Sequence, residues 1–115
     1  MDIKFVDNKL ILPTAKIAFK QNIINVIKIK GGIAILFDTP TSSPLVENIV
    51  ALDLNGQKLW KVQPLSEFNP NITHFSPYVG MTVLENGNIS ATNFFGMNYE
   101  ISYKDGKILS SKMVK

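Results

Sequence analysis

Five pairs of turn-forming residues divide this 115-residue chain into short runs that are rich in β-branched residues. The pairs are Asp7-Asn8, Gly31-Gly32, Asn55-Gly56, Asn86-Gly87 and Asp105-Gly106. Glycine, asparagine and aspartate tolerate the positive φ angles that a tight hairpin turn requires at its two central residues. The spacing therefore predicts a series of antiparallel hairpins, with positive φ at both centres of each turn.

The runs between these turns alternate apolar and polar residues, which is the pattern of strands with one buried face. Ten strands are expected, at Ile3–Val6, Lys9–Leu12, Asn25–Ile29, Ile33–Asp38, Ile49–Leu54, Gln57–Val62, Met81–Glu85, Asn88–Thr92, Glu100–Lys104 and Lys107–Ser110. Residues 33–37 are apolar on both faces, so this strand should be central. The expected core is Ile27, Ile29, Ile33, Ile35, Leu52, Trp60, Val83, Ile89 and Ile101.

Together these patterns predict one all-β domain spanning residues 1–115. We expect an antiparallel meander of about nine or ten strands in consecutive hairpins, rolled into a sandwich or an open barrel. Two proline-containing segments are expected to be loops, Thr39–Glu47 and Pro64–Val79. Within the second loop, Pro64–Phe68 could form one helical turn with proline at its first position.

The composition excludes several classes of function. There is no cysteine, and all twelve basic residues are lysines, spread from Lys4 to Lys115 between acidic residues. The formal charge of +3 therefore describes a mixed, solvated surface. Arginine supplies the fork that grips phosphate or guanine, and its absence argues against specific nucleic-acid binding. We expect neither a cofactor nor a metal site.

The N-terminal residues also bear on location. They contain no apolar run typical of a secretion signal, and no stretch approaches the roughly 18 apolar residues of a membrane span. The abundance of Lys, Ile and Asn is typical of AT-rich coding. We expect a bacterial protein of the cytoplasm that does not bind a membrane.

Catalytic groups are scarce. His74 is the sole histidine, and no serine stands in a nucleophile-elbow motif. Glu85 and Glu100 lie near predicted strand ends, so a small carboxylate-based hydrolase using these residues or His74 stays open as an alternative. The other interpretation is that both glutamates are solvated charges, and we expect no catalytic residue.

Aromatic residues gather in the second half of the chain. The candidate partner-binding residues are Phe75, Tyr78, Asn93, Phe94, Phe95, Met97, Tyr99 and His74. Adjacent residues of a strand point to opposite faces, so one of Phe94 and Phe95 should be core and the other exposed or covered by a loop. Gly96 suggests a bulge or a tight bend. The alternative is that these aromatics form only core and loop cover, whereas exposed aromatics would anchor a protein partner.

The segment Val50–Trp60 resembles the blade motif of quinoprotein-type β-propellers, A-L-D-x-x-x-G-x-x-x-W. The resemblance implies that Asp53 and Gly56 shape a turn and that Trp60 packs across a neighbouring sheet. A propeller needs about four to eight blades, which this length cannot supply. The same strand–turn–strand pattern recurs loosely fifty positions later, at Glu100–Leu109.

The whole chain resembles short bacterial all-β proteins with a central D-x-x-G-x-x-x-W hairpin and a C-terminal N/D-F-x-G-x-x-Y/F…D-G-K-I hairpin. The matching residues are Asp53, Gly56, Trp60, Asn93, Phe94, Gly96, Tyr99, Asp105, Gly106, Lys107 and Ile108. Some of those proteins resemble immunity proteins of contact-dependent toxin systems. The resemblance implies a non-enzymatic protein that binds and neutralises a cognate toxin domain. The alternative is a small β-barrel that carries an apolar ligand.

Overall fold

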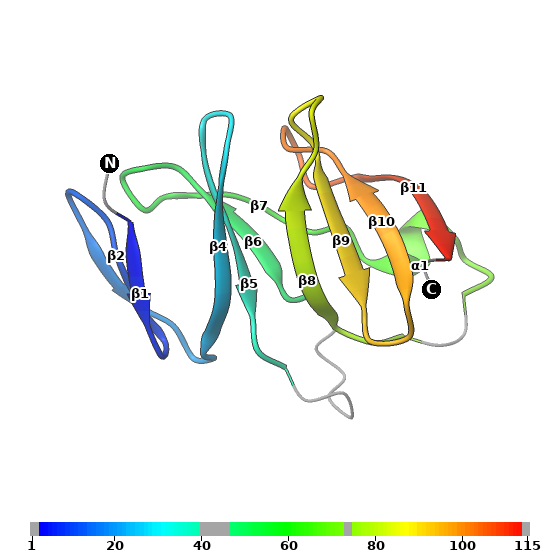
Figure 1. Cartoon of the computed structure of the whole chain (residues 1–115), viewed down its shortest axis with the longest axis horizontal. Coiled ribbons are helices and arrows are strands. Elements are labelled where there is room, and N and C mark those ends of the chain that lie inside the picture. Colours follow the sequence, from blue (N-terminus) through cyan, green and yellow to red (C-terminus); the bar gives the residue numbers. More distant parts are fainter. Residues whose placement is uncertain (1–2, 40–46, 73–74, 114–115) are drawn as a thin grey trace.

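The computed structural model describes residues 3–39, 47–72 and 75–113, which form eleven strands and one short helix (Figure 1). In chain order the elements are β1 (Lys4–Val6), β2 (Lys9–Ile11), β3 (Lys16–Ala18), β4 (Ile23–Ile29), β5 (Gly32–Phe37), β6 (Ile49–Leu52), β7 (Lys58–Lys61), α1 (Leu65–Phe68), β8 (Tyr78–Val83), β9 (Ile89–Asn93), β10 (Met97–Ile101) and β11 (Ile108–Met113). The all-β prediction is confirmed, with one strand more than the ten expected.

The strands form three antiparallel sheets that follow one another along the chain (Figure 1). The N-terminal sheet is β1-β2-β3, the middle sheet is β4-β5-β6-β7, and the C-terminal sheet is β8-β9-β10-β11. Within each sheet, every strand pairs with its neighbour in sequence, as consecutive hairpins require, whereas β3 does not pair with β4 and β7 does not pair with β8. The predicted sandwich therefore has a third layer, and the described strands close no barrel.

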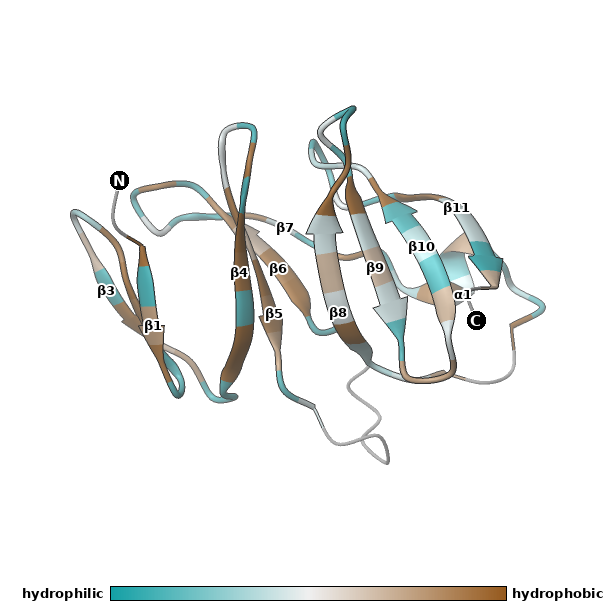
Figure 2. Cartoon of the chain, in the orientation of Figure 1, coloured by the Kyte–Doolittle hydropathy of each residue, from teal (hydrophilic) through white to brown (hydrophobic). Residues whose placement is uncertain are grey.

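The middle sheet is buried on both faces because a sheet covers each of them. Ile33 and Ile35 pack toward the N-terminal sheet with Leu10, in one cluster of buried residues. Ala34 and Leu36 pack on the other face, in a second cluster shared with the C-terminal sheet. All six residues of β5 are buried, which confirms the predicted central strand. Figure 2 shows that β4 and β5 consist mainly of hydrophobic residues.

The predicted core is confirmed at seven positions and differs at two. The buried positions are Ile29, Ile33, Ile35, Leu52, Trp60, Ile89 and Ile101. Ile27 is partly buried against the second cluster. The prediction was wrong for Val83, which is 45% exposed. Val83 is the last residue of the edge strand β8, so a neighbouring strand covers it on one side only.

The hairpin turns lie where the sequence places them, but their geometry differs from the prediction. At the β6–β7 turn the amide of Gly56 donates to the carbonyl of Asp53 over 3.0 Å, closing a three-residue loop. Gly56 has a φ of 89°, whereas Asn55 does not have positive φ. A three-residue loop needs one left-handed residue at its end, so a single glycine is sufficient. The prediction of positive φ at both centres was wrong for all five turn pairs, since only one residue of each has positive φ: Asp7, Gly31, Gly56, Gly87 and Gly106.

The internal repeat corresponds to a structural one. The β6–β7 and β10–β11 hairpins are the third and fourth strands of the middle and C-terminal sheets. Trp60 on β7 donates from Nε1 to the carbonyl of Tyr103, over 2.9 Å, in the β10–β11 turn. This contact confirms that Trp60 packs across the neighbouring sheet, where it fixes the two repeats against each other.

The loop after β7 contains the helical turn that was expected. Helix α1 begins at Leu65, and Pro64 precedes it as the N-cap residue, not as its first helical residue. Of the expected loop Thr39–Glu47, positions 40–46 lie outside the described residues. Among the residues that are described, no helix has the length and apolar character needed to cross a membrane.

Candidate functional site

The β9–β10 turn presents two phenylalanines to solvent at one end of the C-terminal sheet. Phe94 is 57% exposed and Phe95 is 60% exposed. The expectation that one of them is buried was wrong, because neither residue belongs to a strand. Both lie in a loop that Gly96 closes by donating its amide to the carbonyl of Asn93, over 3.1 Å. The two rings meet edge to face, with their centroids 5.7 Å apart.

Asn93 fixes the conformation of this turn. Its Oδ1 atom accepts hydrogen bonds from the backbone amides of Phe95 and Met97, both over 3.0 Å. Asp53 holds the β6–β7 turn in the same way, through the amides two and four residues later. An Asp or Asn three residues before glycine is therefore the sequence signal for both turns. We missed it at Asn93–Gly96, because two adjacent phenylalanines favour a strand.

A second segment lies against this turn. The amide of Phe94 donates to the carbonyl of Pro77 over 3.1 Å, which holds the chain before β8 beside the turn. Phe75, two residues earlier, is 43% exposed. We call Phe75, Phe94 and Phe95 the aromatic surface. Their exposure is unusual, since large aromatic side chains are normally covered in a monomer.

The remaining candidate residues lie behind this surface. Tyr78, Asn93 and Tyr99 are 2%, 5% and 3% exposed, so these three cannot themselves form a broad contact surface. The Tyr78 and Tyr99 rings meet edge to face at 5.8 Å. Burial raises the pKa of both phenols, so both are protonated at neutral pH. Met97 is partly buried, and His74 lies outside the described residues.

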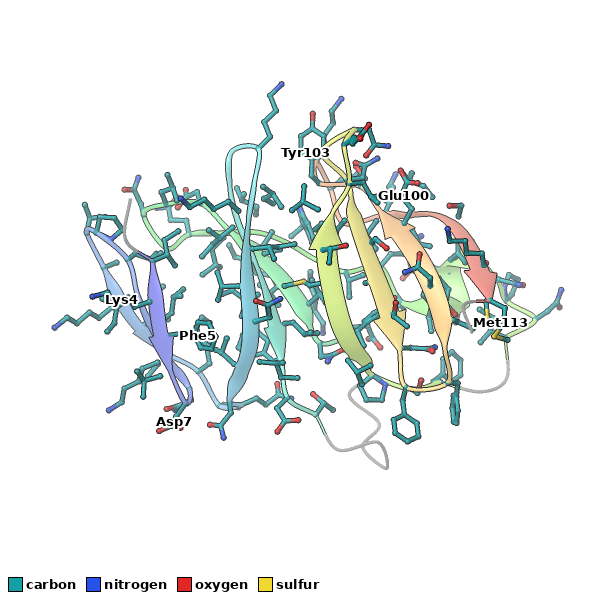
Figure 3. All side chains as sticks on the ribbon, viewed as in Figure 1. Lys4, Phe5, Asp7, Glu100, Tyr103 and Met113 are labelled. Atoms are coloured by element: carbon teal, nitrogen blue, oxygen red, sulfur yellow. The ribbon has the colours of Figure 1, made fainter. Side chains whose placement is uncertain are left out.

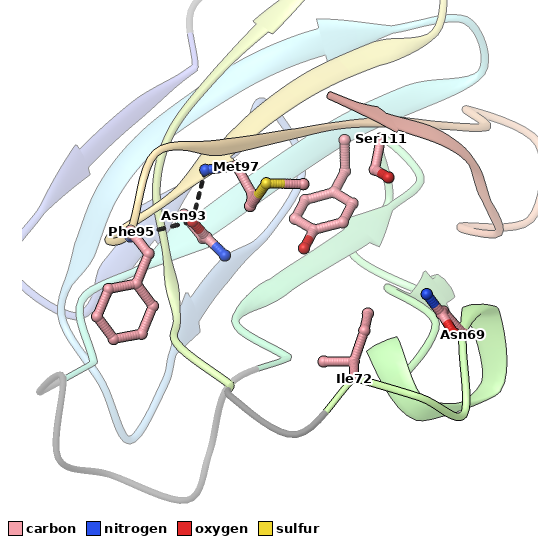
Figure 4. Close-up of a pocket in the computed structure, with 7 residues that line it drawn as sticks. Asn69, Ile72, Asn93, Phe95, Met97 and Ser111 are labelled. Atoms are coloured by element: carbon pink, nitrogen blue, oxygen red, sulfur yellow. Dashed lines mark hydrogen bonds between the residues drawn. The ribbon is translucent and has the colours of Figure 1, made fainter. Parts of the chain in front are cut away.

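A pocket of about 640 Å³ opens beside the aromatic surface (Figure 4). It lies between the inner face of the C-terminal sheet and the segment that follows α1. The described residues that line it are Asn69, Ile72, Asn93, Phe95, Met97, Tyr99 and Ser111. None of them carries a charge. Phe95 belongs both to the aromatic surface and to the pocket, so the two features are continuous.

Glu100 lies away from this site. It projects near Tyr103, at the end of the C-terminal sheet opposite to the β9–β10 turn (Figure 3). Its Oε2 atom accepts hydrogen bonds from the side chains of Asn88 at 2.9 Å and Asn86 at 3.0 Å. These bonds, together with the charge of Lys112, lower the pKa of the Glu100 carboxyl. A general acid needs the opposite shift, so this carboxylate is suited to holding the β8–β9 turn.

Within residues 3–39, 47–72 and 75–113, no three His, Asp or Glu side chains lie close enough together to hold a metal ion.

Comparison with protein-family models identifies the family of the chain. The model of a family described as a domain of unknown function, DUF7957, matches residues 1–113. The chain belongs to the DUF7957 family. Searches of curated proteins and of solved structures find no match. The residues of this DUF7957 domain are therefore the evidence for its function.

The Glu100 interactions predict a pH dependence of the stability of the DUF7957 domain. The lowered pKa in the folded state stabilises the fold above the ordinary glutamate value of 4.5. This contribution is lost as the pH falls through the folded-state pKa. Urea unfolding at pH 7 and at pH 3 should therefore give a smaller decrease in midpoint for Glu100→Gln than for the wild-type protein. Equal decreases would show that these hydrogen bonds do not favour the ionised form.

Proposed function

We propose that this DUF7957 domain is a non-enzymatic protein-binding module whose aromatic surface contacts the partner. The observation that carries the proposal is the exposure of Phe94 and Phe95, at 57% and 60%, on a single turn. Aromatic side chains contribute disproportionately to binding energy at protein interfaces. The two rings lie in mutual contact, so a partner would meet one continuous aromatic surface.

The rigidity of the turn supports the same proposal. Asn93 receives two backbone amides on its side chain and a third on its carbonyl, so the loop is held in one conformation. Ordering a flexible loop on binding would cost free energy, and a loop that is already fixed avoids most of that cost. The amide of Phe94 is also bonded to Pro77, which connects the turn to the segment that carries Phe75.

We further propose that the partner is a cognate bacterial toxin domain that the protein binds and neutralises in the cytoplasm. This part of the proposal rests on the resemblance of the two hairpins to those of short bacterial all-β proteins, some of which resemble immunity proteins. An immunity protein needs a shaped, stable surface and no reactive group. The role proposed for Phe75, Phe94 and Phe95 likewise requires a stable exposed surface and no reactive group.

Survival of a toxin-expressing strain tests this function. The protein would be co-expressed with the toxin encoded by the adjacent gene, alongside a catalytically dead toxin as the control for toxicity. We expect cells to grow normally when the wild-type protein is present and to die when it is absent. Death in both cases, with the protein shown to be soluble and folded, would refute the immunity function.

The two alternatives have less support. A barrel that carries a ligand in its interior would need an open centre, and the spaces between the sheets are filled by two clusters of buried residues. A carboxylate-based hydrolase would need a proton donor, whereas the Glu100 carboxyl has a lowered pKa. The pocket beside Phe95 offers a place for a small ligand outside the core.

A further inference from the structure

Two largely buried polar residues of the pocket beside the aromatic surface each have a hydrogen-bond donor that no described residue pairs. Asn93 and Tyr99 are 5% and 3% exposed, and both line the pocket. The Asn93 side chain uses its oxygen to hold the turn, but its Nδ2 atom bonds to no other described residue. The hydroxyl of Tyr99 likewise bonds to none of the described residues. Polar groups in protein interiors are paired in most proteins, so two donors at the wall of a cavity that no described residue pairs indicate a place for an acceptor atom.

The walls of the pocket define the rest of a ligand. Ile72, Phe95 and Met97 supply apolar contacts, and every lining residue that the structure describes is neutral. The volume of about 640 Å³ lies within the range of roughly 300–1,000 Å³ typical of small-molecule sites. Figure 4 shows Asn93, Phe95 and Met97 on one side of the pocket, with Asn69 and Ile72 across from them. A charged ligand would lose its hydration here without gaining a charged partner.

We propose that this pocket binds a neutral, mainly apolar small molecule whose carbonyl-type oxygen accepts hydrogen bonds from Asn93 Nδ2 and Tyr99 Oη. The Tyr99 phenol is protonated at neutral pH and can act as the donor, and burial raises its pKa further above the ordinary value of 10.0. The inference goes beyond the proposed function, since the ligand needs no protein partner. Because Phe95 belongs to both sites, a bound molecule would also change the aromatic surface.

Two probes of equal shape test the proposal. Benzophenone carries a central carbonyl, and diphenylmethane has a methylene group in its place. The full chain would be labelled with carbon-13 at its methionine methyl groups and titrated with each probe by NMR. We expect the Met97 methyl resonance to shift and that of Met81, buried in the second core cluster, to stay in place. Benzophenone should bind about threefold to tenfold more tightly, as one or two net hydrogen bonds allow.

Three variants identify the site. Tyr99→Phe removes one donor with little change of shape, so it should reduce the advantage of benzophenone and leave the affinity for diphenylmethane unchanged. Ser111→Trp on the exposed strand β11 places a large ring at the pocket and should abolish the binding of both probes. Ser110→Trp is the matched control, because neighbouring residues of a strand point to opposite faces. An unchanged Met81 resonance would verify that each variant is folded.

Three results would overturn the inference. The first is that neither probe shifts the Met97 resonance at its solubility limit. The second is equal affinity for both probes, or an unchanged preference in Tyr99→Phe. The third is equal binding by Ser111→Trp and Ser110→Trp. Such a failure is distinct from failure of the immunity function, because the survival assay uses no small molecule.

Discussion

Gly106→Ala should lower the free energy of unfolding by about 2–5 kcal/mol. Gly106 has a φ of 76°, and a residue with a Cβ atom pays about 1–2 kcal/mol in that left-handed region. An added Cβ would also lie 2.6 Å from Cε3 of Trp60 and 3.0 Å from the carbonyl oxygen of Lys61. Forcing the packed indole aside costs about 1–3 kcal/mol more. The effect is large because Gly106 lies where the middle and C-terminal sheets meet.

Gly31→Ala is the matched control for this variant. Gly31 has a φ of 89°, but an added Cβ would meet no atom within 4 Å. The control should therefore lose only the backbone contribution, about 1–2 kcal/mol. Urea unfolding followed by Trp60 fluorescence measures both variants. An equal loss of unfolding free energy in Gly106→Ala and Gly31→Ala would contradict a steric clash between the added Cβ atom and Trp60.

Asn48→Ala should destabilise the fold by about 3–5 kcal/mol. Asn48 is 3% exposed and lies just before β6. Its Nδ2 atom donates to the carbonyls of Phe37 at 2.8 Å and Tyr78 at 2.9 Å, and its Oδ1 atom accepts from the amide of Tyr78 at 2.9 Å. One side chain thus joins the middle sheet to the first strand of the C-terminal sheet. Alanine would leave buried backbone groups unpaired, at about 1–3 kcal/mol for each.

Asn98→Ala provides the comparison for Asn48→Ala. Asn98 also makes two side-chain hydrogen bonds, to Ser90 Oγ at 2.8 Å and to Thr92 Oγ1 at 3.0 Å. These groups are only partly buried, so water can replace the lost bonds and the cost should stay below about 1 kcal/mol. Chemical denaturation measures the free energy of unfolding of both variants. A loss for Asn48→Ala no larger than that for Asn98→Ala would contradict the role of Asn48 as the link between the sheets.

Local patterns predicted most of the strands because each hairpin is a local structure. The glycine turns and the alternating residues specify β4 through β7 closely, and the double-sided apolar run 33–37 identifies the central strand. The strand β3 was missed because no turn pair precedes it. It forms a local hairpin with β2, Leu10 opposite Ile17, but the connecting residues 12–15 contain no glycine, asparagine or aspartate.

The number of layers and the exposure of the site could not be predicted in the same way. The apolar residues on both faces of β5 indicate that both faces are covered, but not that a separate sheet covers each of them, since that depends on contacts between distant segments. The same limit applies to Phe94 and Phe95, whose exposure follows from the three-residue loop that Asn93 and Gly96 define. The Asx-x-x-Gly spacing, shared with Asp53–Gly56, would have identified that loop. It would not have identified the pocket, which needs the segment after α1 to lie across the sheet.

The affinity for the toxin domain tests the central claim, that the aromatic surface binds the partner. Isothermal titration calorimetry would compare the wild-type protein, the double variant Phe94→Ser/Phe95→Ser and the control Val6→Ser. Val6 is 61% exposed but lies on β1, in the N-terminal sheet at the other end of the molecule (Figure 1). The double variant should bind at least about 30-fold more weakly, as loss of a hot spot implies, while Val6→Ser binds as the wild type does. Wild-type affinity in the double variant would contradict the claim.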